Sequence, residues 1–455
     1  MAFNSGTGVG ALVADVGAFS FRLVGRLTSA RLLIIIQGFA GDDIPRCYRP
    51  SIVGSIHSNA TQTFFELGQP REDMRVDSCV DGSSGLISDW DVLEKLFGYA
   101  QQHFLKVEFS ETPIVIAEKP YNTPKQRHRL CEMMFERNHV PAVFLVKDAV
   151  LACYACGKTT GIAVDIGARS NQLHYPPVLI NLSGTVVTPV VDGWVEARNC
   201  LRSTVGGRAM DGFMLHLVKR RRGATPTPHF KLTRTLDPAA GLVIQPKTLF
   251  PLHPTYEALM NLELGRDIKE TVCRVADAPL TETATRYNSI PTTPFELPDG
   301  TIIDMGIERF QVPELICTAS IDIPTSDDLE VLGFGKETQV LPPLSSEKIP
   351  RIIFDCASRC EPDSQGSLLS NVVVSGGGSC FDGLPERLKT ELERQVHPLN
   401  PGAKLKVIAA GTGERAICPW LGGSILGSLG SFHEMWFTKA EYDEFGAQLV
   451  DRKCP

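Results

Sequence analysis

The sequence lacks several features that would assign it to particular classes of protein. Its most apolar run, Leu32–Ile36, is far shorter than the roughly 20 residues that a membrane-spanning helix needs. No positively charged stretch leads into an apolar core at the start of the chain, so we expect neither a membrane span nor a signal peptide. The formal net charge is −7, which argues against a broad basic surface for a phosphate backbone.

The sequence also lacks a cysteine framework. It contains 13 cysteines, an odd number, scattered along the chain, which predicts a reducing compartment, cytosol or nucleus. Cys153 and Cys156 form a C-x-x-C pair, but no second pair stands at zinc-finger spacing. We interpret the pair as ordinary buried thiols, which are commoner than metal ligands.

Two nearly identical segments are present, "VADVGA" from residue 13 and "AVDIGA" from residue 163. Each is typical of a buried strand that ends in a tight turn with an acid near its tip. Asp15 and Asp165 would hold Mg²⁺ through its waters. Gly17 and Gly167 would let backbone N–H groups approach phosphate oxygens. The two segments are therefore either a clamp for a polyphosphate or two ordinary Asp-x-Gly turns.

A third segment, "VVVSGGGS" from residue 372, predicts a strand followed by a glycine turn and a helix. A turn without side chains at a helix N-terminus can accept phosphate or a flat nucleoside. The segment lacks both the lysine of a P-loop and the spacing of G-x-G-x-x-G. A tight strand-to-helix turn without a ligand is the alternative.

Strands alternate with helices along the chain, which predicts an α/β architecture. We expect strand, turn and strand within residues 10–22, and a hairpin over 295–314 that turns at Asp299 and Gly300. One helix is expected to begin at Asn122 or Thr123, with Pro124 in its first turn. The other main helices are expected at 89–104, 148–157, 211–222 and 263–276.

Several motifs stand in the order in which actins carry them. They are "GFAGDDIPR", "TTGIAVDIG", "GRDIKE", "FELPDG", "VVVSGGG" and "WLGGSILGSLGSFHEMWFTKAEYDEFG". The chain therefore resembles the actin family. The resemblance implies an α/β, actin-like ATPase fold, with two duplicated α/β halves around a nucleotide cleft. Residues 1–166, closed by 425–455, would form the small half, and 167–424 the large half.

This resemblance implies that the cleft binds ATP with Mg²⁺ or Ca²⁺, the cation being held by Asp15 and Asp165 through water. Arg22 stands where actins carry a phosphate-contacting lysine. The nucleotide-binding residues implied by the family are Asp15, Gly17, Arg22, Asp165, Gly167, Gly207, Arg208, Lys269, Glu270, Gly376, Gly377 and Phe381.

The sequence departs from conventional actin at positions that matter for hydrolysis. Ala18 replaces the serine of the first hairpin, and Ala168 replaces an Asp of the second. Asp148 stands where conventional actin has the glutamine that orients the attacking water. Hydrolysis depends on positioning that water, so we expect ATP to be structural, with no or very weak hydrolysis. We assign no catalytic residue.

An apolar groove between the two halves is the usual docking site for helices in actins. An amphipathic helix fits such a groove, and the alternative is that its residues are simply core. The groove would be lined by Tyr154, Gly157, Thr159, Leu426, Leu429, Ser431 and Met435.

The segment "PREDMRVDSCVDGSSGLISDWDVLEKLF" and the ending "VDRKCP" resemble a nuclear branch of the actin family. That resemblance implies a structural subunit of chromatin-remodelling and histone-acetyltransferase complexes in the nucleus, with some protein in the cytoplasm. Actin and a helical segment of a remodeller ATPase or acetyltransferase scaffold would be its partners, with histones as a further family-level expectation and no membrane. The run "KRRR" at 219–222 is either a nuclear localisation signal or a solvated helix end.

Two other functions compete with this one. A divergent cytoskeletal actin would form filaments, but the shortened segment 55–72 argues against it. A sugar kinase of the same fold is opposed by the actin-like stretch near the C-terminus. Two inserts interrupt the resemblance, 23–37 and about 172–184, and it weakens around 224–262 and 315–365. The first insert is either a lineage-specific loop or an unspliced segment.

Overall fold

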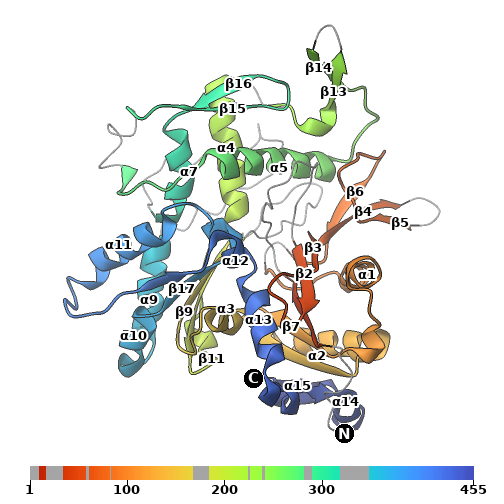
Figure 1. Ribbon diagram of the computed structural model, residues 1–455, viewed down its shortest axis with the longest axis vertical. Coiled ribbons are helices and arrows are strands. Elements are labelled where there is room, and N and C mark those ends of the chain that lie inside the picture. The colour runs from red at the N-terminus through yellow and green to blue at the C-terminus, as the bar shows by residue number, and fades with distance from the viewer. Residues whose placement is uncertain are drawn as a thin grey trace.

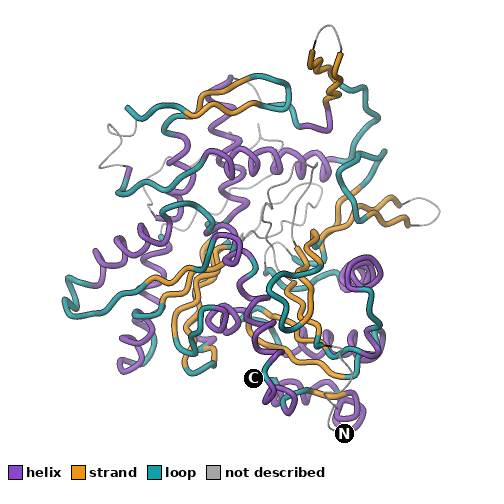
Figure 2. Tube along the Cα trace, viewed as in Figure 1, coloured by secondary structure: helices purple, strands orange, loops and turns teal. Residues whose placement is uncertain are grey.

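The computed structural model describes two lobes, each built around a mixed β-sheet with helices beside it (Figures 1 and 2). Gly17, Arg22, Ala18, Ala168 and most of both expected inserts lie outside the described residues. The described ranges are 10–16, 34–57, 61–81, 84–167, 184–223, 226–237, 241–280, 289–317 and 348–454.

The sheet of the first lobe has the strand order β19-β8-β7-β1-β2-β3. Its centre is parallel, since β1 runs parallel to β7 and β7 to β8, whereas β2 lies antiparallel to β1. The strands are β1 Leu12–Val16, β2 Ile34–Phe39, β3 Cys47–Pro50, β7 Ile114–Glu118, β8 Ala142–Lys147 and β19 Phe437–Thr438.

The sheet of the second lobe repeats this plan, with the order β11-β10-β9-β17-β18 and β12 paired with β10. Here β9 lies parallel to β17 and antiparallel to β10, so it occupies the place that β1 has in the first sheet. The duplication predicted from the sequence is therefore present in the strand order. The strands are β9 Gly161–Ile166, β10 Thr185–Val191, β11 Trp194–Val195, β12 Leu201–Ser203, β17 Val372–Ser375 and β18 Val407–Ala409.

The second strand of the first hairpin lies further along the chain than expected. We predicted it within 10–22, with an insert over 23–37, but the antiparallel partner of β1 is β2, which includes residues 34–37. Three consecutive isoleucines suit a strand, because β-branched side chains pack well on a pleated surface. The additional residues of the insert therefore fall between the two strands of the hairpin.

Helices connect the parallel strands in both lobes. Helix α2, Pro124–Glu132, lies between β7 and β8, and α11, Leu384–Val396, between β17 and β18. The expected cap of α2 is confirmed, since the Thr123 side chain accepts a hydrogen bond from the backbone N–H of Gln126 at 3.3 Å. Helix α1, Trp90–Ala100, likewise starts after Asp89 and continues as a π-helical turn to Leu105.

Two helices cross between the lobes and pack against each other. Helix α3, Asp148–Ala155, leads from β8 to β9, and α13, Cys418–Ser428, leads back to β19. Their close approach requires glycine, because a Cβ on Gly422 would collide with the carbonyl oxygen of Leu151. Trp420 of α13 is buried and donates a hydrogen bond to the carbonyl of Val13 in β1 at 3.2 Å.

The boundary between the two halves lies earlier in the chain than we placed it. Residues 161–166 form β9 of the second sheet, whereas we assigned them to the small half.

A smaller three-stranded sheet, β5-β4-β6, bridges to the second lobe away from α3 and α13 (Figure 1). Tyr256 of α5 donates a hydrogen bond to the carbonyl of Leu67 at 3.0 Å, and the backbone N–H of Val76 donates to Thr255 at the same distance. The lobes are thus joined at both ends. The elements here are β4 Ile52–His57, β5 Thr61–Phe64, β6 Arg75–Ser78, α4 Gly207–Arg222 and α5 Pro254–Val272.

The remaining elements lie around these lobes. The turn at Asp299–Gly300 is confirmed, with φ of +82° at Gly300, but the hairpin ends at Met305 because α7 follows it. Helices α4 and α5 begin earlier than predicted. The other elements are β13 Leu232–Asp237, β14 Gly241–Pro246, β15 Thr293–Glu296, β16 Ile302–Met305, α7 Glu308–Cys317, α9 Ile349–Arg359, α10 Pro362–Leu369, α12 Thr412–Ala416, α14 Lys439–Phe445 and α15 Val450–Lys453.

Candidate functional site

Charged side chains from both lobes meet where the central strands end. Asp15 lies opposite Ala117 in the pair of β1 with β7, and Asp165 holds the equivalent place opposite Ser375 in the pair of β9 with β17. Lys119 follows β7, and its Nζ lies 2.6 Å from Oδ2 of Asp148 and 3.2 Å from Oδ2 of Asp165. We call Asp15, Asp148, Asp165 and Lys119 the interlobe charge cluster.

The interlobe charge cluster carries more negative groups than positive ones. Burial raises the pKa of Asp15 to about 7; Lys119 opposes this shift, and Asp148 and Asp165 add to it. Burial also raises the pKa of Asp148, again against the effect of Lys119. Burial disfavours the ammonium form of Lys119, but the three carboxylates overcome this and raise its pKa. Three carboxylates against one ammonium favour an additional cation.

The glycine turn after β17 packs directly on this cluster. Gly376 has φ of +81°, which glycine adopts readily, and a Cβ there would collide with Oδ1 of Asp165. A Cβ on Gly378 would likewise press on Ile166. The turn therefore approaches the second Asp-x-Gly segment with backbone alone, and the N–H of Gly376 itself donates to the carbonyl of Arg415 at 2.9 Å.

The base of the second hairpin touches the start of α4. The backbone N–H of Gly167 donates to the carbonyl of Gly184 at 2.9 Å, and that of Gly207 donates to the carbonyl of Gly167 at 3.0 Å. A Cβ on Gly206 would collide with Gly184. Four glycines thus bring the hairpin and the α4 N-terminus together.

A second polar group lies between α4 and α5. Nζ of Lys269 is 2.6 Å from Oδ1 of Asp211 and 3.5 Å from the carbonyl of Gly207. Arg208 is buried, and its Nη1 has no hydrogen-bond partner among the described residues. Burial, together with Arg266, lowers the pKa of Arg208 to about 10. A buried donor without a partner fits a site that receives an anionic or carbonyl oxygen.

The structure therefore brings the predicted nucleotide residues into two neighbouring groups. Asp15, Asp165, Gly167 and Gly376 belong to the first, and Gly207, Arg208 and Lys269 belong to the second. Glu270 is exposed. Gly377 opens the short helical turn after β17, and Phe381 follows it, packed into the core of the second lobe. Gly17 and Arg22 lie outside the described residues.

Sequence reasoning missed Lys119. It directly follows β7, and β7 is the parallel neighbour of β1. Because the carboxyl ends of neighbouring parallel strands meet at one edge of a sheet, a charged residue just after a buried strand was a usable signal. The ion pair with Asp165 could not be predicted in this way, since it joins two different sheets.

The residues predicted to line a partner groove lie at the surface beside α3 and α13. Leu429 and Met435 are 48% and 44% exposed, and Thr159 and Ser431 are exposed as well. Leu426 is half-buried against the core of the first lobe. Tyr154 is half-buried too, and Gly157 follows α3 with φ of +66°. These exposures argue against the alternative that Leu429 and Met435 are core residues.

Two of the four basic side chains at 219–222 form ion pairs within the second lobe. Arg221 pairs with Glu308 at 2.5 Å, and Arg222 pairs with Asp299 at 2.6 Å. These pairs favour its interpretation as a helix end, because they hold two of the four cations in the fold.

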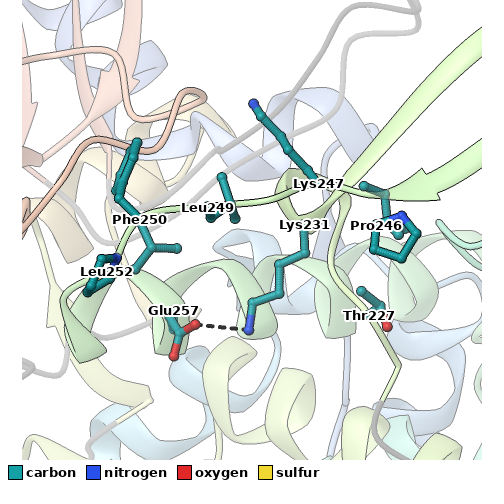
Figure 3. A pocket seen from close by; sticks show the side chains of 10 residues that line it. Thr227, Lys231, Pro246, Lys247, Leu249, Phe250, Leu252 and Glu257 are labelled. Atoms are coloured by element: carbon teal, nitrogen blue, oxygen red, sulfur yellow. Dashed lines mark ion pairs between the residues drawn. The ribbon is translucent and has the colours of Figure 1, made fainter.

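A separate hollow of about 470 Å³ lies between the β13–β14 hairpin and the start of α5 (Figure 3). Figure 3 shows Lys231 and Glu257 facing each other across its floor, with Nζ 2.9 Å from Oε1. Phe250 lies on its rim. The hollow shares no residue with the interlobe charge cluster and falls where the family resemblance is weak, so we assign it no part in nucleotide binding.

Candidate metal-ligand clusters and membrane-spanning helices were both sought in the described part of the chain. No three or more His, Cys, Asp or Glu side chains there are arranged to hold a metal ion. No described helix is both long and apolar enough to cross a membrane.

A family model for actin matches residues 32–455 of this chain. The chain therefore belongs to the actin family. It is 33% identical to "Actin-related protein 4" of Oryza sativa subsp. indica, over 99% of each chain. It is 30% identical to proteins of the same name from Arabidopsis thaliana, over 99% of each chain, and Schizosaccharomyces pombe, over 100% of this chain and 99% of that one. The family resemblance and the actin-like α/β fold are thereby confirmed.

Proposed function

We propose that this protein is an ATP-binding, non-filament structural subunit of nuclear chromatin-remodelling or histone-acetyltransferase complexes. The proposal that the protein binds ATP rests on the interlobe charge cluster. In this cluster Nζ of Lys119 in one lobe lies 3.2 Å from the carboxylate of Asp165 in the other. The match to relatives named Actin-related protein 4 over nearly the full length supports the choice of branch.

The residues present fit ATP with a divalent cation. Asp15 and Asp165 would hold the cation through its waters, as Mg²⁺ prefers, and the surplus of carboxylates over Lys119 suits its charge. Arg208 has a buried donor without a partner in the described part of the chain. A bound nucleotide and its cation would supply a charged bridge between the two lobes.

The geometry at Asp148 supports weak or absent hydrolysis. Asp148 is buried, and its carboxylate is held by Lys119 at 2.6 Å. A side chain committed to an ion pair is poorly placed to orient an attacking water. ATP would then act as a structural ligand that stabilises the two-lobed form.

The exposed surface beside α3 and α13 supports a helical partner. Exposed Leu429 and Met435 on this surface offer the apolar contacts that an amphipathic helix uses. We propose that this helix belongs to a remodeller ATPase or an acetyltransferase scaffold, that actin binds beside this protein on the same segment, and that histone contact is a further role. The protein would then act in the nucleus, with some in the cytoplasm.

Binding of a fluorescent ATP analogue to the purified full-length protein tests the nucleotide part. We expect saturable binding with Mg²⁺, a lower affinity in excess EDTA, and a higher unfolding temperature with ATP. A protein that neither binds the analogue nor gains stability would contradict the proposal.

Purification of the tagged protein from nuclear extract, followed by mass spectrometry, tests the partner part. Recovery of a remodeller ATPase together with actin is the expected result, whereas recovery of only cytoplasmic filament and motor proteins contradicts it. A pelleting assay at high protein concentration separates the filament alternative, which predicts abundant sedimenting polymer with ATP and Mg²⁺.

A further inference from the structure

A buried arginine holds the glycine turn that follows β17. Arg415 belongs to the short helix α12 and is only 7% exposed. Its Nη1 donates a hydrogen bond to the carbonyl oxygen of Ser379 at 2.8 Å, and its own carbonyl oxygen accepts one from the backbone N–H of Gly376 at 2.9 Å. One residue therefore holds both ends of the turn, one through its side chain and the other through its backbone.

The guanidinium group of Arg415 is bound by neutral oxygens. Besides the carbonyl of Ser379, the hydroxyl oxygen of Thr412 accepts a hydrogen bond from its Nη2 at 3.3 Å. Its Nε is buried and has no hydrogen-bond partner in the described part of the chain. Arginines are rarely buried without an ion pair. The burial of Arg415 is instead offset by hydrogen bonds to the turn and to its own helix, so its position and that of the turn depend on each other.

A second contact joins the end of the turn to the same helix. Sγ of Cys380 lies 3.3 Å from the carbonyl oxygen of Thr412. Within the turn, the backbone N–H of Ser379 donates to the carbonyl of Gly376 at 3.1 Å. The side chain of Arg415 therefore supports a turn that is already closed on itself, and it fixes where the turn lies.

The position of the turn in its turn restricts Asp165. Ser375, the residue before the turn, pairs with Asp165 between β17 and β9. A Cβ on Gly376 would collide with the carboxylate of Asp165, and one on Gly378 would collide with Ile166. Such close packing transmits a displacement of one group to the next. A shift of the turn would therefore move the carboxylate that we propose to hold a cation through water.

We propose that Arg415 is a positioning residue of the ATP site, which fixes the glycine turn and thereby orients the Asp165 carboxylate toward the cation. This inference rests on the proposed function, because it needs a cation at Asp165. Arg415 acts through the turn and Asp165. Replacement of groups that orient the ligands of a metal typically lowers metal affinity 10–100-fold. Loss of the guanidinium group should therefore change the requirement for Mg²⁺ as well as stability.

A Mg²⁺ titration of ATP-analogue binding to the full-length protein tests this role. Arg415→Lys keeps the positive charge, but a single ammonium group cannot replace the planar fork that bonds Ser379 and Thr412. We expect the Mg²⁺ concentration at half-saturation to rise about tenfold. Thr412→Val removes one acceptor and should cause a smaller rise, and it carries the test if Arg415→Lys does not fold. An unchanged Mg²⁺ requirement in the folded variants would overturn the proposal.

Arg387→Lys is the matched control for loss of stability. Arg387 of α11 is 2% exposed, and its Nη2 lies 2.9 Å from Oε1 of Glu314. Its replacement should lower the unfolding temperature without a change in the Mg²⁺ requirement. If Arg387→Lys raised that requirement as much as Arg415→Lys, the effect would reflect general destabilisation, and the positioning role would be refuted.

Amide hydrogen exchange without added nucleotide tests the support of the turn by itself. We expect the amides of Ser379 and Cys380 to exchange about threefold faster or more in Arg415→Lys than in the wild type or Arg387→Lys, because loss of the guanidinium bond permits local opening. Equal rates would overturn the proposal even in a protein that binds ATP. A wild-type protein that binds no ATP would refute the proposed function and with it the role at the cation, and the exchange rates would still decide whether Arg415 holds the turn.

Discussion

The ammonium group of Lys119 in the first lobe lies 3.2 Å from the carboxylate of Asp165 in the second. Lys119 follows the strand next to β1, and Asp165 lies on β9, the strand that repeats the place of β1. The two duplicated halves are therefore joined by a direct ion pair at the point where we propose that ATP and its cation bind. The same ammonium group also lies 2.6 Å from Asp148, so one cation serves a carboxylate at the start of α3 and another in the second sheet.

Replacement of Lys119 by Met should destabilise the protein strongly. It leaves three close carboxylates, of which Asp15 and Asp148 are buried, without their counter-charge, and loss of one partner of a buried pair costs about 3–5 kcal/mol of unfolding free energy. Denaturant unfolding measures this loss. Lys95→Met, at an exposed lysine that bonds Thr63, is the control and should change stability by no more than about 0.5 kcal/mol. Equal stability of the two variants would show that the ion pairs of Lys119 contribute little.

Replacement of Asp148 by Gln should increase ATP hydrolysis. A neutral amide cannot form the ion pair with Lys119 and can orient a water molecule instead. We expect single-turnover hydrolysis to rise on the order of tenfold, about 1.4 kcal/mol in activation free energy. Asp148→Asn is the matched control, since it removes the charge with a shorter side chain and should gain less. An unchanged rate in Asp148→Gln would mean that other departures from actin limit the reaction.

Replacement of Gly376 by Ala should impair nucleotide binding. The added Cβ would collide with the Asp165 carboxylate, and the φ of +81° is unfavourable for alanine, with a strain of about 1–3 kcal/mol. ATP-analogue titration and thermal unfolding measure both effects. Gly366→Ala in α10 is the control, because a Cβ there meets nothing within 4 Å; it should leave binding intact and stabilise the helix slightly. Unaltered binding by Gly376→Ala would place the phosphates elsewhere.

Replacement of Leu429 by Asp should weaken helical partners without unfolding the protein. Leu429 is 48% exposed, so we expect a stability change within about 0.5 kcal/mol. Loss of an apolar anchor should lower affinity for the partner helix by tenfold or more, roughly 1.4 kcal/mol. Leu399→Asp, at a leucine that is 73% exposed in the second lobe, should leave the interaction unchanged. If both variants retain the partner, the groove is not its binding site.

Local features of the fold were predictable from the sequence where neighbouring residues decide them. Thr123 before Pro124 predicts the start of α2, and Asp299–Gly300 predicts a hairpin turn, since capping and positive φ depend on a few adjacent residues. The early starts of α4 and α5 were not predicted. Gly207 and Arg208 begin α4 through contact with the distant Gly167, which no local pattern reveals.

The repeated Asp-x-Gly segments and the ordered family motifs alone determined that this chain has two duplicated halves with an acid at each central strand. Only the tertiary structure decided which groups meet. It placed β2 at Ile34–Phe39, brought Lys119 to Asp165, and packed Gly422 of α13 against Leu151 of α3. The physical reason is the same in each case. Strand pairing, ion pairing between sheets and helix packing at Gly422 join residues that are far apart in the chain, and their energies depend on the distances that the whole fold creates.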